Sequence, residues 1–196
     1  MTELGTAAAP APTVRPATRR TLLRWMVSFA GYPLGGAVAM LLTGPVDDVR
    51  AALAGGLVTG AVLGAVQAWA LAVNRRRAIG WTLASALGLM TGLALGASVV
   101  GFETGLGDVA LQGALCGLVL GIAQTVVLVP WVGRLALVWP LALAGIWTLG
   151  WVTSTSIGIR VEDQFTVFGS SGALVATALT GVLPLVLRRR AARSAS

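Results

Sequence analysis

Six apolar stretches divide this chain, and polar or charged residues gather in the short segments between them. The apolar stretches cover residues 23–43, 52–73, 79–100, 109–131, 135–157 and 170–187. A helix needs about 20 predominantly apolar residues to cross the hydrocarbon core of a bilayer, which is ~30 Å thick. The pattern therefore predicts an all-α integral membrane protein with six transmembrane helices.

A tryptophan recurs at the start of every second apolar stretch, and a glycine follows it eleven residues later. The pairs are Trp25 with Gly36, Trp81 with Gly92, and Trp139 with Gly150. Each unit of two helices would enter and leave on the same side of the membrane, so the units are expected to be parallel. We therefore predict three αα-hairpin repeats, at about 23–73, 79–131 and 135–188, with a pseudo-threefold axis along the membrane normal.

Small residues recur at every fourth position of the predicted return helices and lead to a glutamine. Gly56, Gly60, Gly64 and Gln67 match Gly113, Gly117, Gly121 and Gln124 at a constant offset (113 − 56 = 57), and Gly88, Gly92 and Gly96 form a similar stripe on the third helix. Such spacing places the small residues on one helix face, where they allow close helix packing in lipid. The third return helix keeps small residues, but Leu183 replaces the glutamine and Pro184 follows.

The order GxxxGxxxGxxQ, then a short arginine segment, then a tryptophan with a glycine eleven residues later resembles uncharacterised small bacterial multi-span membrane proteins. The resemblance covers most of residues 25–187. It implies a bacterial inner-membrane setting and brings no activity with it.

Composition and charge support a membrane protein and predict its orientation. Hydrophobic residues make up 56% of the 196 residues, charged residues 11%, and mean hydropathy is +0.85. All 14 basic residues are arginines. Twelve of them lie on one predicted side: Arg15, Arg19, Arg20, Arg24, Arg75, Arg76, Arg77, Arg134, Arg188, Arg189, Arg190 and Arg193. By the positive-inside rule, this side and both termini are cytoplasmic in the cell membrane.

The basic side also limits the classes of partner. The net charge of +7 comes with no soluble domain to carry a nucleic-acid site, so we expect anionic lipids at the cytoplasmic face instead. Residues 1–20 are rich in Ala, Pro and Thr and are predicted to be a disordered cytoplasmic tail, and residues 191–196 are predicted to be a second cytoplasmic tail after a membrane domain over 21–190. A membrane-protein partner or a homo-oligomer also fits this picture.

Polar residues in or near the predicted helices allow two interpretations. Gln67 and Gln124 are expected to bond between helices, although both amides could instead face a central cavity and contact a polar solute. Asp47, Glu103 and Glu162 lie at matching outer positions and would form a carboxylate ring at a pore mouth. The simpler interpretation is that outer loops are wet and that their acids, such as Asp48 and Asp108, cap the next helix.

Candidate chemistry is sparse. The chain has no histidine, no acid within a predicted helix, and one cysteine, Cys116, so we expect no enzyme activity, metal or cofactor. The leading hypothesis is a non-enzymatic accessory subunit or lipid-associated scaffold. The alternative is a passive pore or facilitator for a small cation or polar solute. A membrane-embedded enzyme built on the hydroxyl residues 153–156 comes third.

Two further expectations concern tryptophans and prolines. Five tryptophans lie near predicted cytoplasmic helix ends, and we expect them to form an aromatic belt at the lipid headgroups: Trp25, Trp69, Trp81, Trp131 and Trp139. Pro33 and Pro184 fall inside predicted helices and are expected to bend them.

Overall fold

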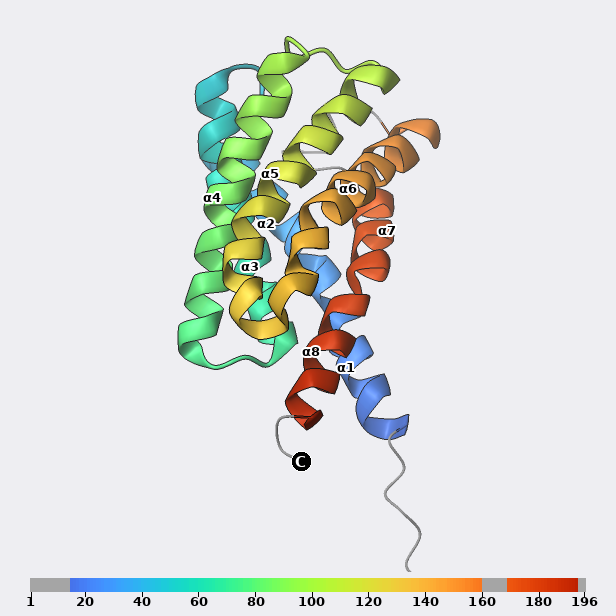
Figure 1. Cartoon of the computed structure of the whole chain (residues 1–196). Coiled ribbons are helices and arrows are strands. Elements are labelled where there is room, and N and C mark those ends of the chain that lie inside the picture. The colour runs from blue at the N-terminus through green and yellow to red at the C-terminus, as the bar shows by residue number, and fades with distance from the viewer. Residues whose placement is uncertain (1–14, 160–168, 194–196) are drawn as a thin grey trace, which may run out of the picture.

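The computed structural model describes residues 15–159 and 169–193, and every regular element in this part of the chain is a helix (Figure 1). The elements are α1 (Arg15–Val27), η1 (Ser28–Ala30), α2 (Gly31–Thr43), α3 (Val49–Leu71), α4 (Arg75–Val99), α5 (Leu106–Val132), η2 (Gly133–Val138), α6 (Trp139–Ser156), α7 (Ser170–Thr180) and α8 (Val182–Arg193). The prediction of an all-α chain is confirmed for these residues.

Five helical stretches in the described chain are long and apolar enough to cross a membrane. They are Thr18–Thr43, Val49–Leu71, Arg75–Val99, Leu106–Ser156 and Ser170–Arg190. The fourth stretch contains α5, η2 and α6, so it includes two of the six predicted helices. These stretches fit a membrane-spanning protein.

The first helix begins earlier than the hydrophobic pattern predicts. It starts at Arg15 rather than Leu23, so residues 15–20 of the predicted tail are helical, while residues 1–14 lie outside the described chain. Pro16 falls in the first turn of α1, where its missing N–H costs no helical hydrogen bond. The arginine-rich sequence that follows has good helix propensity, which hydropathy alone does not reveal.

The helices that carry Pro33 and Pro184 are both interrupted. The 3₁₀ turn η1 separates α1 from α2 just before Pro33, and α7 gives way to α8 at Gly181, three residues before Pro184. Proline lacks the N–H that would bond the carbonyl four residues earlier, and its ring crowds that carbonyl. The prediction of local bends at these two prolines agrees with the breaks.

Successive helices pack as antiparallel neighbours. Along α3 and α4, Gly56 lies against Leu89 while Gly64 lies against Thr82, which is the order that antiparallel helices produce. The same reversal relates α2 to α3, α4 to α5, α5 to α6, and α6 to α7. The last helices return to the first, since α7 and α8 contact α1, and the Trp25 indole N–H donates to the Thr177 carbonyl at 2.9 Å.

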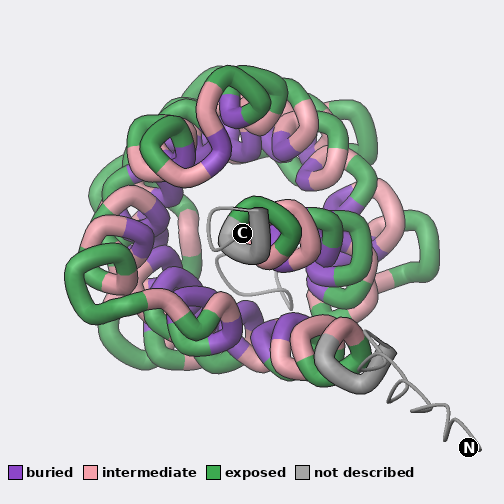
Figure 2. The backbone as a smooth tube through the Cα atoms, turned by 60° about the horizontal axis from the view of Figure 1, so that its bottom comes forward, coloured by how far each residue is buried: buried purple, intermediate pink, exposed green. Residues whose placement is uncertain are grey.

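Buried residues line the inner side of this closed arrangement, and exposed residues cover its outer side (Figure 2). Many outer residues are large and apolar, including Leu41 and Val126, which are 85% and 74% exposed. A membrane protein presents such a surface to lipid. The described chain begins and ends at the same end of the bundle as the α3–α4 connection and η2 (Figure 1).

Candidate functional site

The two glutamines predicted to lie within helices are buried and accept hydrogen bonds from tryptophans. Gln67 Oε1 of α3 accepts from Trp81 Nε1 of α4 at 3.2 Å, and Gln124 Oε1 of α5 accepts from Trp139 Nε1 of α6 at 2.8 Å. Gln124 Nε2 also donates to Ser85 Oγ at 3.0 Å. Gln124 therefore links three helices, α4, α5 and α6, through one side chain.

Short connections bring each tryptophan opposite its glutamine. Ala72, which follows α3, adopts a left-handed φ of 54°, and the side chain of Asn74 then accepts from Arg77 N to cap α4. This turn returns the chain so that Trp81 meets Gln67 two turns into α4. Gly133, with a φ of 60°, makes the corresponding reversal after α5.

The first of the three tryptophans, Trp25, meets a backbone acceptor instead of a glutamine. Its indole N–H donates to the Thr177 carbonyl of α7. Leu183, at the position of the missing glutamine, is buried in the same cluster as Trp25. Trp25, Trp81 and Trp139 thus each have a partner on the helix that precedes them in the closed arrangement.

These bonds correct the expectation of an aromatic belt. Trp25 and Trp81 are each only 1% exposed and lie inside the bundle, where their N–H groups need protein partners. Trp69 is exposed as expected, and the Arg24 guanidinium lies over its ring at 4.9 Å. Trp131 stacks on Trp81 with ring centroids 6.0 Å apart. The prediction is therefore wrong for Trp25 and Trp81, because an indole suits a buried hydrogen bond as well as a headgroup.

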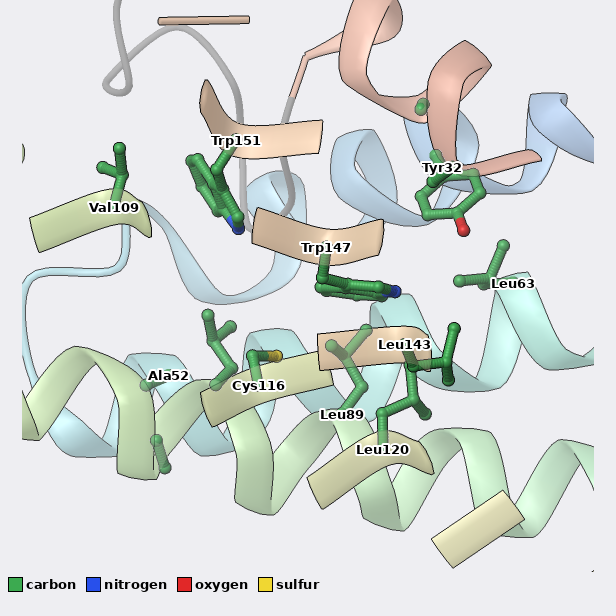
Figure 3. Packing of buried hydrophobic residues seen from close by; sticks show 14 residues of the cluster. Tyr32, Ala52, Leu63, Leu89, Val109, Cys116, Leu120, Leu143, Trp147 and Trp151 are labelled. Atoms are coloured by element: carbon green, nitrogen blue, oxygen red, sulfur yellow. The ribbon is translucent and has the colours of Figure 1, made fainter. Parts of the chain in front are cut away.

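The centre of the bundle is filled by large side chains (Figure 3). Tyr32, Leu63, Leu89, Leu120 and Leu143 surround Trp147, and the Tyr32 and Trp147 rings lie 6.4 Å apart. The void that Trp147 and the Trp–Gln pairs line together with Tyr32 has a volume of about 10 Å³. A single water needs roughly 10–15 Å³, so this space holds one water at most.

The glycine stripes lie where neighbouring helices approach closely. A Cβ on Gly60 would lie 2.5 Å from the Ser85 carbonyl oxygen, and a Cβ on Gly92 would lie 2.8 Å from the Cys116 carbonyl oxygen. A Cβ at any of the nine predicted packing positions would come within 3.0 Å of a neighbouring helix: Gly56, Gly60, Gly64, Gly88, Gly92, Gly96, Gly113, Gly117 and Gly121. No larger residue fits these positions unless the helices move.

The predicted outer acids lie apart from the buried glutamines. Asp47 and Glu103 are exposed in the loops before α3 and α5, and Glu162 lies outside the described residues. Asp48 caps α3, since its Oδ1 accepts from Ala51 N at 2.7 Å, as expected for a loop acid. Asp108 lies in the first turn of α5, and Gly105 is the N-cap instead.

The described residues contain no cluster of three or more side chains suited to a metal ion. The hydroxyl segment includes Ser154, which is buried where α6 meets α7. Its Oγ contacts Ser171 Oγ at 3.0 Å and accepts from Gly172 N at 3.1 Å, so it joins α6 to α7. Ser154 therefore has a packing role at this contact.

No protein family, curated protein or solved structure matches this chain.

The sequence singled out the glutamines and the tryptophans separately and missed their pairing. The signal was present, because Trp81 follows Gln67 by 14 residues and Trp139 follows Gln124 by 15 (81 − 67 = 14; 139 − 124 = 15). A short turn between two antiparallel helices brings residues at that separation to the same height. The acceptor of Trp25 is a backbone carbonyl. Every residue has one, so the residue types give no indication of this bond.

Proposed function

We propose that this chain is a six-span membrane protein with both termini in the cytoplasm, built from three parallel helical hairpins. The stretch Leu106–Ser156 has 51 residues, which would extend about 77 Å as one straight helix, far more than the ~30 Å of a bilayer core. Its antiparallel halves, α5 and α6, support two crossings. The related contacts of the first two glycine stripes support the internal repeat.

Within that topology, we propose a non-enzymatic role as an accessory subunit or lipid-associated scaffold. The observation that carries this proposal is the filled centre of the bundle, with a void of about 10 Å³. A pore or facilitator needs a path lined by groups that replace the solute's hydration. Here Gln67 Oε1 bonds Trp81, and both polar atoms of the Gln124 amide bond Trp139 and Ser85.

The proposed role predicts impermeable proteoliposomes. Purified protein in vesicles should pass neither small cations nor small polar solutes above the rate of protein-free vesicles. The decisive control is Gln124→Leu, which removes the amide from the axis. If the natural protein passes a solute and Gln124→Leu changes the rate of passage, the scaffold proposal is wrong and the result supports the pore instead.

A second experiment tests the subunit role. Gentle purification followed by mass spectrometry of co-purifying proteins and lipids should recover a defined partner or lipid. Gly60→Leu and Gly117→Leu, which disturb helix packing, should reduce that recovery. Recovery at the natural level with both substitutions in a folded protein would contradict the idea that packing carries the function.

The topology has its own test, because Cys116 is buried and is the only cysteine. In a Cys116→Ala background, single cysteines at Asp47, Glu103, Arg76 and Arg134 are treated with a membrane-impermeant maleimide on intact cells. Labelling of Asp47→Cys and Glu103→Cys alone is expected. Labelling of both Glu103→Cys and Arg134→Cys in intact cells would rule out the two crossings of α5 and α6, and labelling of Arg76→Cys and Arg134→Cys alone would reverse the proposed orientation.

A further inference from the structure

We propose that a groove between α6 and α8 binds one acyl chain of an anionic phospholipid from the cytoplasmic leaflet, with the headgroup phosphate at Arg134 and Arg190. This site deepens the proposed lipid-associated role and depends on its cytoplasmic placement of the arginines. The groove has a volume of about 190 Å³ and is lined by α5, η2, α6 and α8.

The lining is suited to hydrocarbon. Leu128, Val132, Ala136 and Leu183 are buried and form the floor. Residues at the outer edge are more than half exposed and open the groove toward lipid: Leu135, Val138 and Val182. Every lining residue is apolar apart from the indole N–H of Trp139, which already donates to Gln124. The groove therefore offers contacts to methylene groups and no partner for a polar solute.

The groove exists because the third hairpin departs from the other two. The helix breaks between Thr180 and Val182, and α8 then runs beside α1, where Arg188 Nη1 lies 3.4 Å from Thr21 Oγ1. This course keeps α8 from packing closely along the first turns of α6, whose opposite side contacts α5 at Gly121. Leu183 contributes its side chain to the space.

Two arginines place positive charge at the cytoplasmic rim. Arg190 Nη1 lies 3.5 Å from the position that a Cβ on Gly133 would occupy, so the end of α8 reaches the start of η2. Arg134 follows Gly133 and is exposed. Gly133 lies next to Val132, which lines the groove. An apolar groove with basic side chains at its headgroup end is complementary to an anionic phospholipid.

The test is native mass spectrometry of the full chain in detergent, titrated with phosphatidylglycerol or phosphatidylcholine of identical acyl chains. We expect one phosphatidylglycerol to be retained under conditions that remove other lipids, at several times the occupancy of phosphatidylcholine. Ala142→Phe, which fills the groove, should reduce retention of both lipids by about tenfold. Leu141→Phe is the matched control, because Leu141 is 73% exposed on the outer face of the same helix.

The headgroup contact is tested on the surface, where folding is not at risk. Arg134→Gln with Arg190→Gln should remove the preference for phosphatidylglycerol and leave retention of phosphatidylcholine unchanged. The control pair, Arg19→Gln with Arg20→Gln, removes the same charge from the same end and should keep the preference.

Two results would overturn the site: unchanged phosphatidylglycerol retention in folded Ala142→Phe, or equal losses in the two arginine pairs. A dimer that appears in place of bound lipid and is lost in Ala142→Phe would assign the groove to a second copy and also refute the lipid. These outcomes leave the permeability test untouched, so the site and the scaffold role fail separately.

Discussion

Gly60→Ala is expected to destabilise the bundle, although alanine is the better helix former. A Cβ at this position would lie 2.5 Å from the Ser85 carbonyl oxygen, 2.8 Å from Ala86 Cα and 3.0 Å from Leu89 Cβ. Two of these neighbours are backbone atoms of α4, so no side-chain rotation relieves the contact. The helices α3 and α4 must separate.

The size of the effect follows from the geometry. Carbon atoms pack best at about 3.5–4.0 Å, so the added methyl requires a shift of roughly 1 Å. A gap of that size forfeits about a quarter to a half of each dispersion contact, and the neighbouring contacts of Gly56 and Gly64 open with it. Overpacking of this kind costs about 1–3 kcal/mol, which exceeds the gain of about 1 kcal/mol in helix propensity.

Thermal unfolding in detergent, followed by near-ultraviolet circular dichroism, measures the effect, and Gly145→Ala is the matched control. Gly145 is in α6, is exposed, and has no atom within 4 Å of the position of an added Cβ. It should therefore gain helix propensity without a clash and melt at or above the natural temperature. If Gly60→Ala melts as high as Gly145→Ala, the close approach of α3 and α4 is wrong.

Three further substitutions test the buried hydrogen bonds and a cap by the same unfolding measurement. Gln124→Leu should lower the free energy of unfolding by about 1–3 kcal/mol, because it leaves the Trp139 N–H without its acceptor. Adding Trp139→Phe should recover most of that loss, and no recovery in the double variant would contradict the pairing. Trp25→Phe should lower the free energy of unfolding less than Trp139→Phe alone does, because the Thr177 carbonyl keeps a hydrogen bond from Thr180 Oγ1. A larger loss for Trp25→Phe would argue against the backbone acceptor. Asp48→Ala should cost about 0.5–2 kcal/mol as a lost cap, and an unchanged melting temperature would mean that the cap contributes nothing.

Hydropathy and spacing predicted the helices well, because both report properties of single segments. The apolar stretches match α3 and α4 closely, and the small-residue period places Gly60 and Gly92 where helices touch. The start of α1 was missed because arginines can extend a helix beyond the bilayer. The full length of the first helix therefore reflects helix propensity, while hydropathy detects only the apolar part that suits lipid.

The interior was harder to predict, because an indole has two stable environments and the sequence does not choose between them. At a headgroup its N–H bonds water, while inside the bundle it bonds a glutamine across the turn. The choice depends on whether the opposite helix carries an acceptor at the same height. Gln67 provides one for Trp81. To predict this pair, one must know how two helices are aligned, and the pattern of a single helix does not give that.

The segment from α6 to α8 meets the same requirement in a different way, and the groove beside α8 is a consequence. A buried indole N–H must have an acceptor, and Leu183 cannot replace the glutamine in that role. Gly181 N bonds the Ala178 carbonyl instead of continuing the helical ladder to Thr177, so the Thr177 carbonyl becomes available to Trp25. The break that supplies this acceptor also directs α8 away from α6. The missing glutamine, the interrupted helix and the apolar groove are therefore parts of one structural change. A Leu183→Gln substitution that left the helix interrupted would place the amide in the apolar groove.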